Sequence, residues 1–234
     1  MNTNDHIRAV AFDLDGTLFD TLPSLTAAAN EVLRHAGLRA VPQESLRAAL
    51  SEGLRALFDT ALALQPEQPS ADDALALERQ FLRCYEDRWL DQAVLYAGVS
   101  AMVGTLRERC LPLAICTNRD RESTAVLLAA AGLATSFDVV VGLGDAARPK
   151  PAPEPMLRVL DRFALPPAQL LFVGDSRLDA RCAELSRVRF AAHLGGYSSR
   201  PDDLQPCEMP FTDYAALHDW VLQRLPAAKD ACHA

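Results

Sequence analysis

Residues 9–17 read AVAFDLDGT, and this stretch decides the fold. Its first four residues, Ala9 to Phe12, form an unbroken apolar run that stops at Asp13. Such a short continuous run is typical of a strand that is covered on both faces, as strands of parallel sheets are. We therefore expect a buried parallel strand that leads directly into the acidic segment 13–17.

The same pattern recurs further along the chain, where short apolar runs alternate with helical patterns. The other strands that these runs predict are residues 113–116, 137–141, 170–173 and 188–194. The helices predicted between them are residues 100–109, 123–131, 153–163 and 178–187. This alternation predicts an α/β fold with a doubly wound parallel sheet, in which ligands bind at the carboxyl ends of the strands.

Residues 21–95 interrupt the alternation of strands and helices. Apolar residues recur here at the three- and four-residue spacing of helices, which predicts an inserted α-helical cap subdomain. The α/β core then consists of residues 1–20 and 96–234, and Gly98 supplies a turn at the junction.

Composition and net charge disfavour several classes of binding partner. The chain has 234 residues, of which 50% are hydrophobic and 23% charged, as in a globular protein. A net charge of −8 disfavours nucleic acid and anionic membrane surfaces as partners. The longest nearly unbroken apolar run, residues 125–134, is far shorter than the roughly 18–20 residues of a membrane-spanning helix.

Cysteine usage indicates the compartment. The six cysteines show no CxxC spacing and are too sparse for a disulfide scaffold, so we expect reduced thiols. The first apolar stretch is too short for the core of a secretion signal. Together these features predict a cytoplasmic protein, whose assembly stays open between a monomer and a homodimer.

Polar residues follow each of the clearest strands, and the carboxyl ends of parallel strands meet at one edge of a sheet. Asp13 and Asp15 alternate along an extended chain and so lie on one side, with Gly16 allowing close backbone approach. Such a pair binds a hard divalent cation or divides into a nucleophile and a proton shuttle, although a helix cap and a turn are the plain alternative. The remaining strand ends add a hydroxyl, an ammonium group and two further carboxylates: Thr117, Lys150, Asp175 and Asp179.

In this order, Asp-x-Asp, Thr, Lys and Asp-xxx-Asp, the residues resemble the four motifs of the haloacid dehalogenase (HAD) superfamily. The chain is similar to the phosphatase branch with a helical cap after the first motif, and most resembles its phosphoglycolate phosphatase-like members. The resemblance covers roughly residues 8–20 and 95–200, while the cap matches by location and helical character only. It implies a Rossmann-like HAD core and Mg²⁺-dependent hydrolysis of a small phosphorylated metabolite, either phosphoglycolate-like or a sugar phosphate.

The resemblance also implies a role for each matching residue. Asp13 would be the nucleophile that forms a covalent aspartyl phosphate, and Asp15 the acid and base of the two half-reactions. Mg²⁺ would be held by Asp13, Asp175 and the backbone carbonyl of Asp15, and Asp179 would support the site. The residues that would bind the phosphate are Gly16, Thr117, Asn118 and Lys150.

Other functions fit parts of the same pattern. A phosphomutase would share the phosphoenzyme on Asp13 and return the phosphoryl group to a sugar. A receiver-like module also gathers Asp, Thr and Lys around Mg²⁺, but its phospho-accepting Asp lies on a middle strand of a shorter domain. A non-catalytic phosphate-binding module is disfavoured by the intact acids, and a dehalogenase by the presence of Asp15. The histidines show no ligand spacing, so we expect no zinc site.

Two features lie outside these motifs. The sequence Gly195-Gly196-Tyr197 follows the fifth predicted strand and resembles a loop near the active site of family phosphatases, although a simple turn is the plainer interpretation. Cys182 stands where relatives often carry a small apolar residue, and we expect it to be part of the core.

Overall fold

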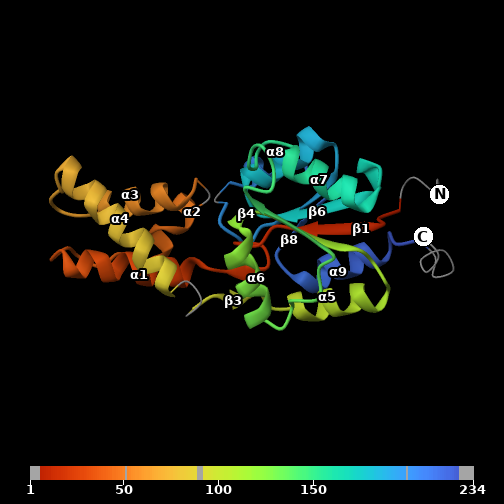
Figure 1. Ribbon diagram of the computed structural model, residues 1–234, viewed down its shortest axis with the longest axis horizontal. Helices are drawn as coiled ribbons and strands as arrows, with labels where there is room; N and C mark the ends of the chain where they lie inside the picture. Colours follow the sequence, from red (N-terminus) through yellow and green to blue (C-terminus); the bar gives the residue numbers. More distant parts are fainter. Residues whose placement is uncertain (1–5, 51, 89–91, 199, 227–234) are drawn as a thin grey trace. The chain divides into compact units, whose positions relative to one another are not determined.

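The computed structural model describes residues 6–50, 52–88, 92–198 and 200–226 (Figure 1). These residues form two compact units. The first takes the described parts of Met1–Phe19, Leu95–Gly196 and Arg200–Ala234. The second takes the described parts of Asp20–Val94 and Tyr197–Ser199. We propose that the functional division follows the sequence, with a core of residues 1–20 and 96–234 and a cap of residues 21–95.

The first unit is built on a six-stranded sheet in which all pairs of neighbouring strands are parallel. Its strands are β1 (Ala9–Phe12), β4 (Leu113–Asp120), β5 (Val139–Leu143), β6 (Leu170–Gly174), β7 (Arg189–His193) and β8 (Met209–Phe211). Their spatial order is β5-β4-β1-β6-β7-β8, so the order reverses at β1. A doubly wound sheet binds ligands at such a switch point, here between the carboxyl ends of β1 and β6.

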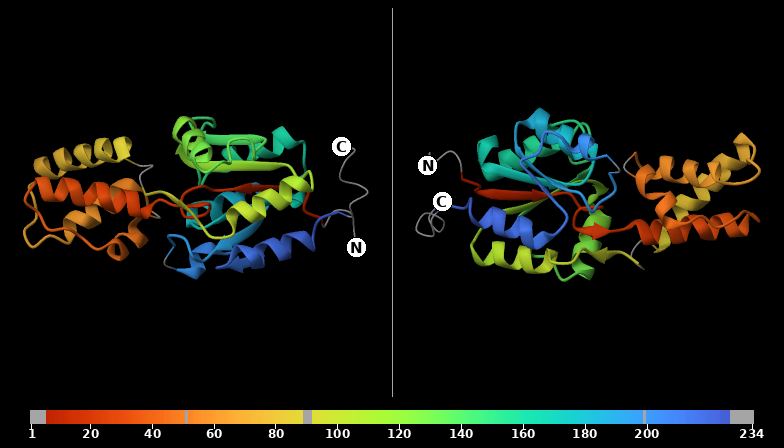
Figure 2. Two further views of the ribbon diagram at one scale, coloured as in Figure 1. Left: turned by 90° about the horizontal axis from the view of Figure 1, so that it is seen from below. Right: turned by 180° about the vertical axis from the view of Figure 1, so that it is seen from behind.

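Helices cover both faces of this sheet. They are α5 (Val99–Glu108), α6 (Arg121–Ala130), α7 (Glu154–Phe163), α8 (Arg177–Ser186) and α9 (Tyr214–Leu222), with short 3₁₀ helices at η3 (Pro167–Gln169) and η4 (Pro201–Leu204). Figures 1 and 2 show α7 and α8 on one face, with α5 and α9 on the other. All four residues of β1 are fully buried, as its continuous apolar sequence predicts, and Ala9 and Ala11 pack in one cluster with Met156 and Ala180.

The second unit is α-helical. Its elements are α1 (Leu22–His35), η2 (Gln43–Ser45), α2 (Arg47–Leu50), α3 (Leu54–Ala63) and α4 (Ala71–Arg88). The helices bury their apolar stripes in a separate core, where the rings of Phe58 and Phe81 stack with centroids 4.7 Å apart. Two short strands, β2 (Phe19–Asp20) and β3 (Val94–Leu95), pair where the chain passes between the units.

The predicted fold class, a doubly wound α/β core with a helical insert, is confirmed, while several element bounds differ. The strand predicted at 113–116 continues to Asp120, because the chain stays paired with β5 after an irregularity beyond Cys116. Neither β8 nor α9 is among the elements predicted from the sequence. β8 has only three residues and carries Pro210 at its centre. Because proline is confined to sheet edges and strand starts, such a segment does not display a strand pattern.

The described residues bear on two expectations from the sequence, that no segment spans a membrane and that the cysteines are reduced thiols. None of the helices there is long and apolar enough to cross a membrane. Five cysteines are free thiols: Cys84, Cys110, Cys116, Cys182 and Cys207. Cys182 is fully buried in the core, as predicted, and Cys232 lies outside the described residues.

Candidate active site

The candidate site lies in the first unit, at the carboxyl ends of β1, β4 and β6. Asp13 follows β1 directly, and its N–H donates to the carbonyl of Val173 in β6 at 2.8 Å. The chain then turns at Gly16, whose φ of 81° is left-handed and costs glycine little. The strand end therefore presents Asp13 at the switch point of the sheet.

A buried ion-pair cluster surrounds Asp13. The Nζ atom of Lys150 lies 2.6 Å from Oδ1 of Asp13 and 2.6 Å from Oδ1 of Asp179. All three residues are buried, with Lys150 only 4% exposed. A lysine is rarely buried without partners, and here two carboxylates share its charge.

Asn118 holds the backbone of Lys150 in place. Its Nδ2 donates to the Lys150 carbonyl and its Oδ1 accepts from the Lys150 N–H, both at 2.9 Å. The side chain of Asn118 thus positions Lys150, so the backbone N–H of Asn118 is the better candidate for the phosphate contact predicted for this residue.

Asp175 and Asp179 enter the site from the end of β6 and the start of α8. Oδ1 of Asp175 accepts a 3.0 Å hydrogen bond from Thr17 Oγ1. Oδ2 of Asp179 accepts from the N–H and the hydroxyl of Ser176, which completes a capping box at the start of α8. A Cβ on Gly174 would lie 2.5 Å from Cβ of Asp179, so glycine is what allows this close approach.

The electrostatics of the cluster are unbalanced. Ligand oxygens of Asp13, Asp175 and Asp179 lie within 4.8 Å of one another. With three carboxylates and the single ammonium of Lys150, the group carries −2 when fully ionised. Burial and the Asp179 carboxylate raise the pKa of Asp13 to about 7, although Lys150 acts in the opposite direction. Burial alone would lower the pKa of Lys150, but the carboxylates of Asp13 and Asp179 raise it well above its ordinary value.

This donor set fits a divalent cation. Buried carboxylate oxygens are the ligands that Mg²⁺ uses, and a charge of +2 would balance the cluster. Asp179 has both oxygens engaged, one by Lys150 and one by Ser176. Asp13 and Asp175 are therefore the better candidate ligands. Among the described residues the grouped carboxylates do not include that of Asp15, whose predicted ligand is its backbone carbonyl.

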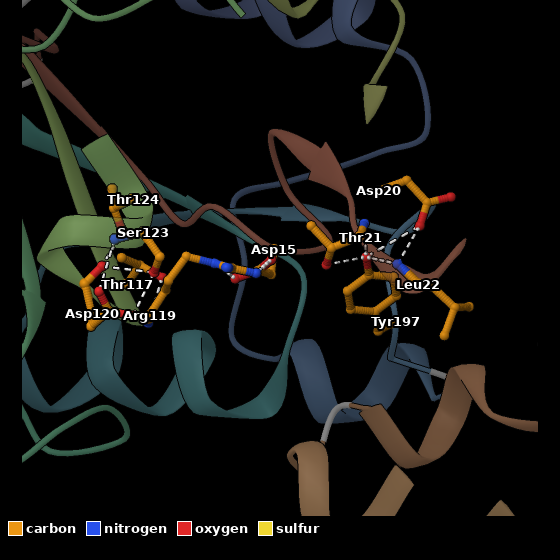
Figure 3. A network of polar contacts seen from close by, with 10 residues as sticks. All are labelled: Asp15, Asp20, Thr21, Leu22, Thr117, Arg119, Asp120, Ser123, Thr124 and Tyr197. Carbon is orange, nitrogen blue, oxygen red and sulfur yellow. Dashed lines mark hydrogen bonds and ion pairs between the residues drawn. The ribbon is translucent and has the colours of Figure 1, made fainter. Parts of the chain in front are cut away.

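Asp15 and Thr117 are connected by Arg119, a residue that no sequence motif identified (Figure 3). Arg119 donates from Nε to Oδ2 of Asp15 at 2.9 Å and from Nη2 to Oδ1 at 2.7 Å. Its backbone N–H donates to Thr117 Oγ1 at 3.1 Å. The sequence offers one signal for Arg119, its position two residues after Thr117, the predicted phosphate ligand. This signal is weak, because an arginine in such a place is usually a solvated surface residue.

Gly16 is fixed through its carbonyl oxygen, which lies 2.8 Å from Nδ1 of His193. Burial lowers the pKa of His193, while this hydrogen bond opposes the shift. A neutral imidazole with its proton on Nδ1 fits this contact. The histidine thereby holds the turn that follows the two aspartates of the first motif.

The segment Gly195-Gly196-Tyr197 makes more specific contacts than a simple turn requires. A Cβ on Gly196 would lie 2.3 Å from Cβ of Asp175, so a side chain there would displace the candidate metal ligand. In the helical unit, the Tyr197 hydroxyl accepts from the N–H groups of Thr21 and Leu22 at 2.7 and 3.1 Å (Figure 3). Thr21 gives α1 no side-chain cap of its own, and Tyr197 supplies that function, together with Oδ1 of Asp20, which accepts from the Leu22 N–H at 3.2 Å.

Comparisons with known proteins agree with this architecture. The sequence matches the haloacid dehalogenase-like hydrolase family over residues 10–193. Phosphoglycolate phosphatase from Escherichia coli (strain K12) is 35% identical over 215 residues, which cover 85% of each protein. The phosphoglycolate phosphatase of Rhodospirillum rubrum is 34% identical over 218 residues, covering 92% of this chain and 90% of that protein.

Solved structures show the same fold. The crystal structure of a predicted phosphoglycolate phosphatase from Haemophilus somnus superposes with a TM-score of 0.81 at 25% identity, covering 94% of this chain and 99% of that one. The chain belongs to the haloacid dehalogenase-like hydrolases. Within them it is phosphoglycolate phosphatase-like, so the predicted enzyme class, a phosphoric monoester hydrolase of this superfamily, is confirmed.

Proposed function

We propose that this protein is a Mg²⁺-dependent phosphatase that hydrolyses a small phosphorylated metabolite through an aspartyl phosphate on Asp13. The observation that carries the proposal is the placement of Asp13 at the switch point, 2.6 Å from the buried ammonium of Lys150 and beside the carboxylate of Asp175. Relatives named phosphoglycolate phosphatase support a phosphoglycolate-like substrate, and a sugar phosphate has the same reacting group.

The residues present match what this reaction needs. Unaided hydrolysis of a phosphate monoester is so slow that enzymes accelerate it by up to ~10²¹. A dianionic substrate is repelled by carboxylates, so positive charge must accompany it into the site. Lys150 supplies part of that charge. A divalent cation held by Asp13, Asp175 and the backbone carbonyl of Asp15 would supply the rest and orient the phosphoryl group.

The reaction would proceed in two displacements at phosphorus. A carboxylate oxygen of Asp13 attacks phosphorus, the bond to the ester oxygen breaks, and Asp15 gives that oxygen a proton. Asp15 then takes a proton from water, whose oxygen attacks phosphorus and releases Asp13 as the carboxylate. The Thr117 hydroxyl and the backbone N–H of Asn118 would hold the phosphate oxygens, and Asp179 would keep Lys150 in place. Gly16, whose N–H donates to the Phe19 carbonyl at 2.8 Å, would line the phosphate site through the turn that it forms.

The helical insert, residues 21–95, would act as the cap that selects the substrate. A cap that closes over a small substrate excludes water, which would otherwise screen Lys150 and the metal. We also place the protein in the cytoplasm, since the five cysteines of the described chain are free thiols. A net charge of −8 disfavours nucleic acid as a partner.

A phosphate-release screen tests the proposed function. The wild type and Asp13→Asn are compared on phosphoglycolate, sugar phosphates and an aryl phosphate, with Mg²⁺ and with excess chelator. We expect release by the wild type with Mg²⁺ only, and none by Asp13→Asn, because an amide cannot attack phosphorus. Undiminished release after verified metal removal would contradict the metal assignment. Isomerisation of a sugar phosphate without phosphate release would identify a phosphomutase instead.

A further inference from the structure

The two hydrogen bonds from Arg119 to Asp15 form a fork that holds both oxygens of this carboxylate. We propose that Arg119 is a positioning residue for Asp15, which it orients for proton transfer from a fixed point beside Thr117. The inference rests on the proposed role of Asp15 as acid and base. Arg119 itself would touch neither the phosphoryl group nor the leaving group.

An irregularity in β4 sets the direction of the Arg119 side chain. β4 and β5 pair in register up to Cys116 and Val141, and the next pair is Asp120 with Leu143. Residues 117–119 of β4 therefore stand opposite a single residue of β5, Gly142. This arrangement is a β-bulge in β4. Bulges bend the strand and re-aim side chains, and they are frequent beside active sites.

Gly142 allows the bulge to pack closely against the neighbouring strand. A Cβ at this position would lie 2.9 Å from the carbonyl oxygen of Arg119 and 3.0 Å from the backbone nitrogen of Arg121. Because these are backbone atoms, a side chain at this position would force the chain around Arg119 to shift. The carbonyl end of Arg119 is thus confined by β5.

The backbone on either side of Arg119 is also hydrogen-bonded. On one side its N–H donates to Thr117 Oγ1. On the other, Asp120 caps α6, with Oδ1 accepting from the Ser123 N–H at 2.8 Å and its carbonyl accepting from Thr124 Oγ1 at 2.7 Å (Figure 3). The arginine therefore projects from a fixed base, and its side chain is only 10% exposed.

A fixed arginine has a direct consequence for Asp15. A planar guanidinium that donates two parallel hydrogen bonds defines the plane and position of a carboxylate, which a single contact does not. The Asp15 side chain is 27% exposed, so without the fork water would compete for both oxygens. An acid or base must lie within hydrogen-bond reach of the proton that it moves, and a misplacement of about 1 Å costs about 100-fold in rate.

The test is a double-mutant cycle on the full-length protein with Mg²⁺. Arg119→Met should lower kcat on an alkyl phosphate by about 10- to 100-fold with KM little changed. It should cost less on an aryl phosphate, whose good leaving group depends less on Asp15. In the Asp15→Asn background the same change should have no further effect. Arg119→Lys should recover part of the loss, because an ammonium can still reach the carboxylate.

Arg121→Met is the matched control. This arginine lies two residues further on, its side chain is 66% exposed, and it pairs with Asp145 at 3.5 Å. The control should retain wild-type kcat, and melting temperatures of all variants check folding.

Near-normal kcat in both Arg119→Met and Arg119→Lys would overturn the inference. It would also be overturned if Arg119→Met lowered kcat by the same factor in the wild type and in the Asp15→Asn background. A raised KM with normal kcat would make Arg119 a substrate-binding residue instead. A normal rate in Asp15→Asn alone would refute the proposed role of Asp15, which is a separate failure.

Discussion

Removing the ammonium of Lys150 is the perturbation whose consequence the structure defines most sharply. In Lys150→Met, the carboxylates of Asp13 and Asp179 keep their burial and lose a partner that lies 2.6 Å from each. Breaking a buried ion pair by removing one member costs about 3–5 kcal/mol. For a protein of this size each kcal/mol corresponds to roughly 2–4 °C in melting temperature, so the variant should melt roughly 6–20 °C below the wild type.

The loss should depend on pH in a defined direction. Burial and Asp179 already raise the pKa of Asp13 to about 7 in the intact protein, and loss of the lysine removes a contribution that lowers it. A carboxyl group whose pKa is raised on folding binds more protons in the folded state, so its contribution to stability falls as pH rises through that pKa. The difference between variant and wild type should therefore be largest near pH 8 and shrink toward pH 5.

The assay is urea unfolding with chelator present, so that no cation replaces the ammonium. Arg148→Met is the control, because Arg148 lies two residues away, is 69% exposed and pairs with Glu154 at the surface. Such an exposed pair contributes little to stability, because water and salt screen it. A free energy of unfolding for Lys150→Met within about 1 kcal/mol of the wild type at pH 8 would refute the buried-cluster argument.

Three further results are expected. Burial lowers the pKa of His193, so the free energy of unfolding should fall as pH drops below about 6.5, by at most about 1.4 kcal/mol per pH unit. In His193→Gln the slope of this free energy against pH should be shallower. An unchanged slope would exclude His193 as the cause. Tyr197→Phe should cost about 1–3 kcal/mol of unfolding free energy, because the Thr21 N–H loses its acceptor and the Leu22 N–H keeps only Oδ1 of Asp20, and full stability would contradict this capping role. Replacing residues 21–95 with a short linker should reduce kcat/KM on the best phosphate ester more than on an aryl phosphate, whereas equal losses would mean that the insert does not select the substrate.

The sheet and the position of most candidate residues could be predicted because parallel strands impose a simple geometry. An apolar run that ends in a polar residue, as β1 does at Asp13, marks the edge at which ligands bind. Asp13, Lys150 and Asp175 are far apart in sequence and lie in one buried cluster for this reason. Local patterns were sufficient for Asp13 and Asp175, which directly follow β1 and β6, whereas Lys150 reaches the cluster from the loop between β5 and α7.

The contacts that tune the site depend on tertiary packing and left no such local pattern. Arg119 reaches Asp15 through a bulge that depends on the pairing of β4 with β5 and on the space beside Gly142. Tyr197 caps a helix that begins 175 residues earlier in the chain. Neither contact has a periodicity or a motif that a single sequence displays.

Trapping the phosphoenzyme tests the central claim most directly. The protein is mixed with Mg²⁺ and a ³²P-labelled substrate, quenched in acid within the first turnovers, digested, and the labelled peptide identified by mass spectrometry. The reasoning predicts one acid-stable, hydroxylamine-sensitive acyl phosphate on Asp13, which is absent in Asp13→Asn. Label on any other residue, or phosphate release by Asp13→Asn at the wild-type rate, would contradict it.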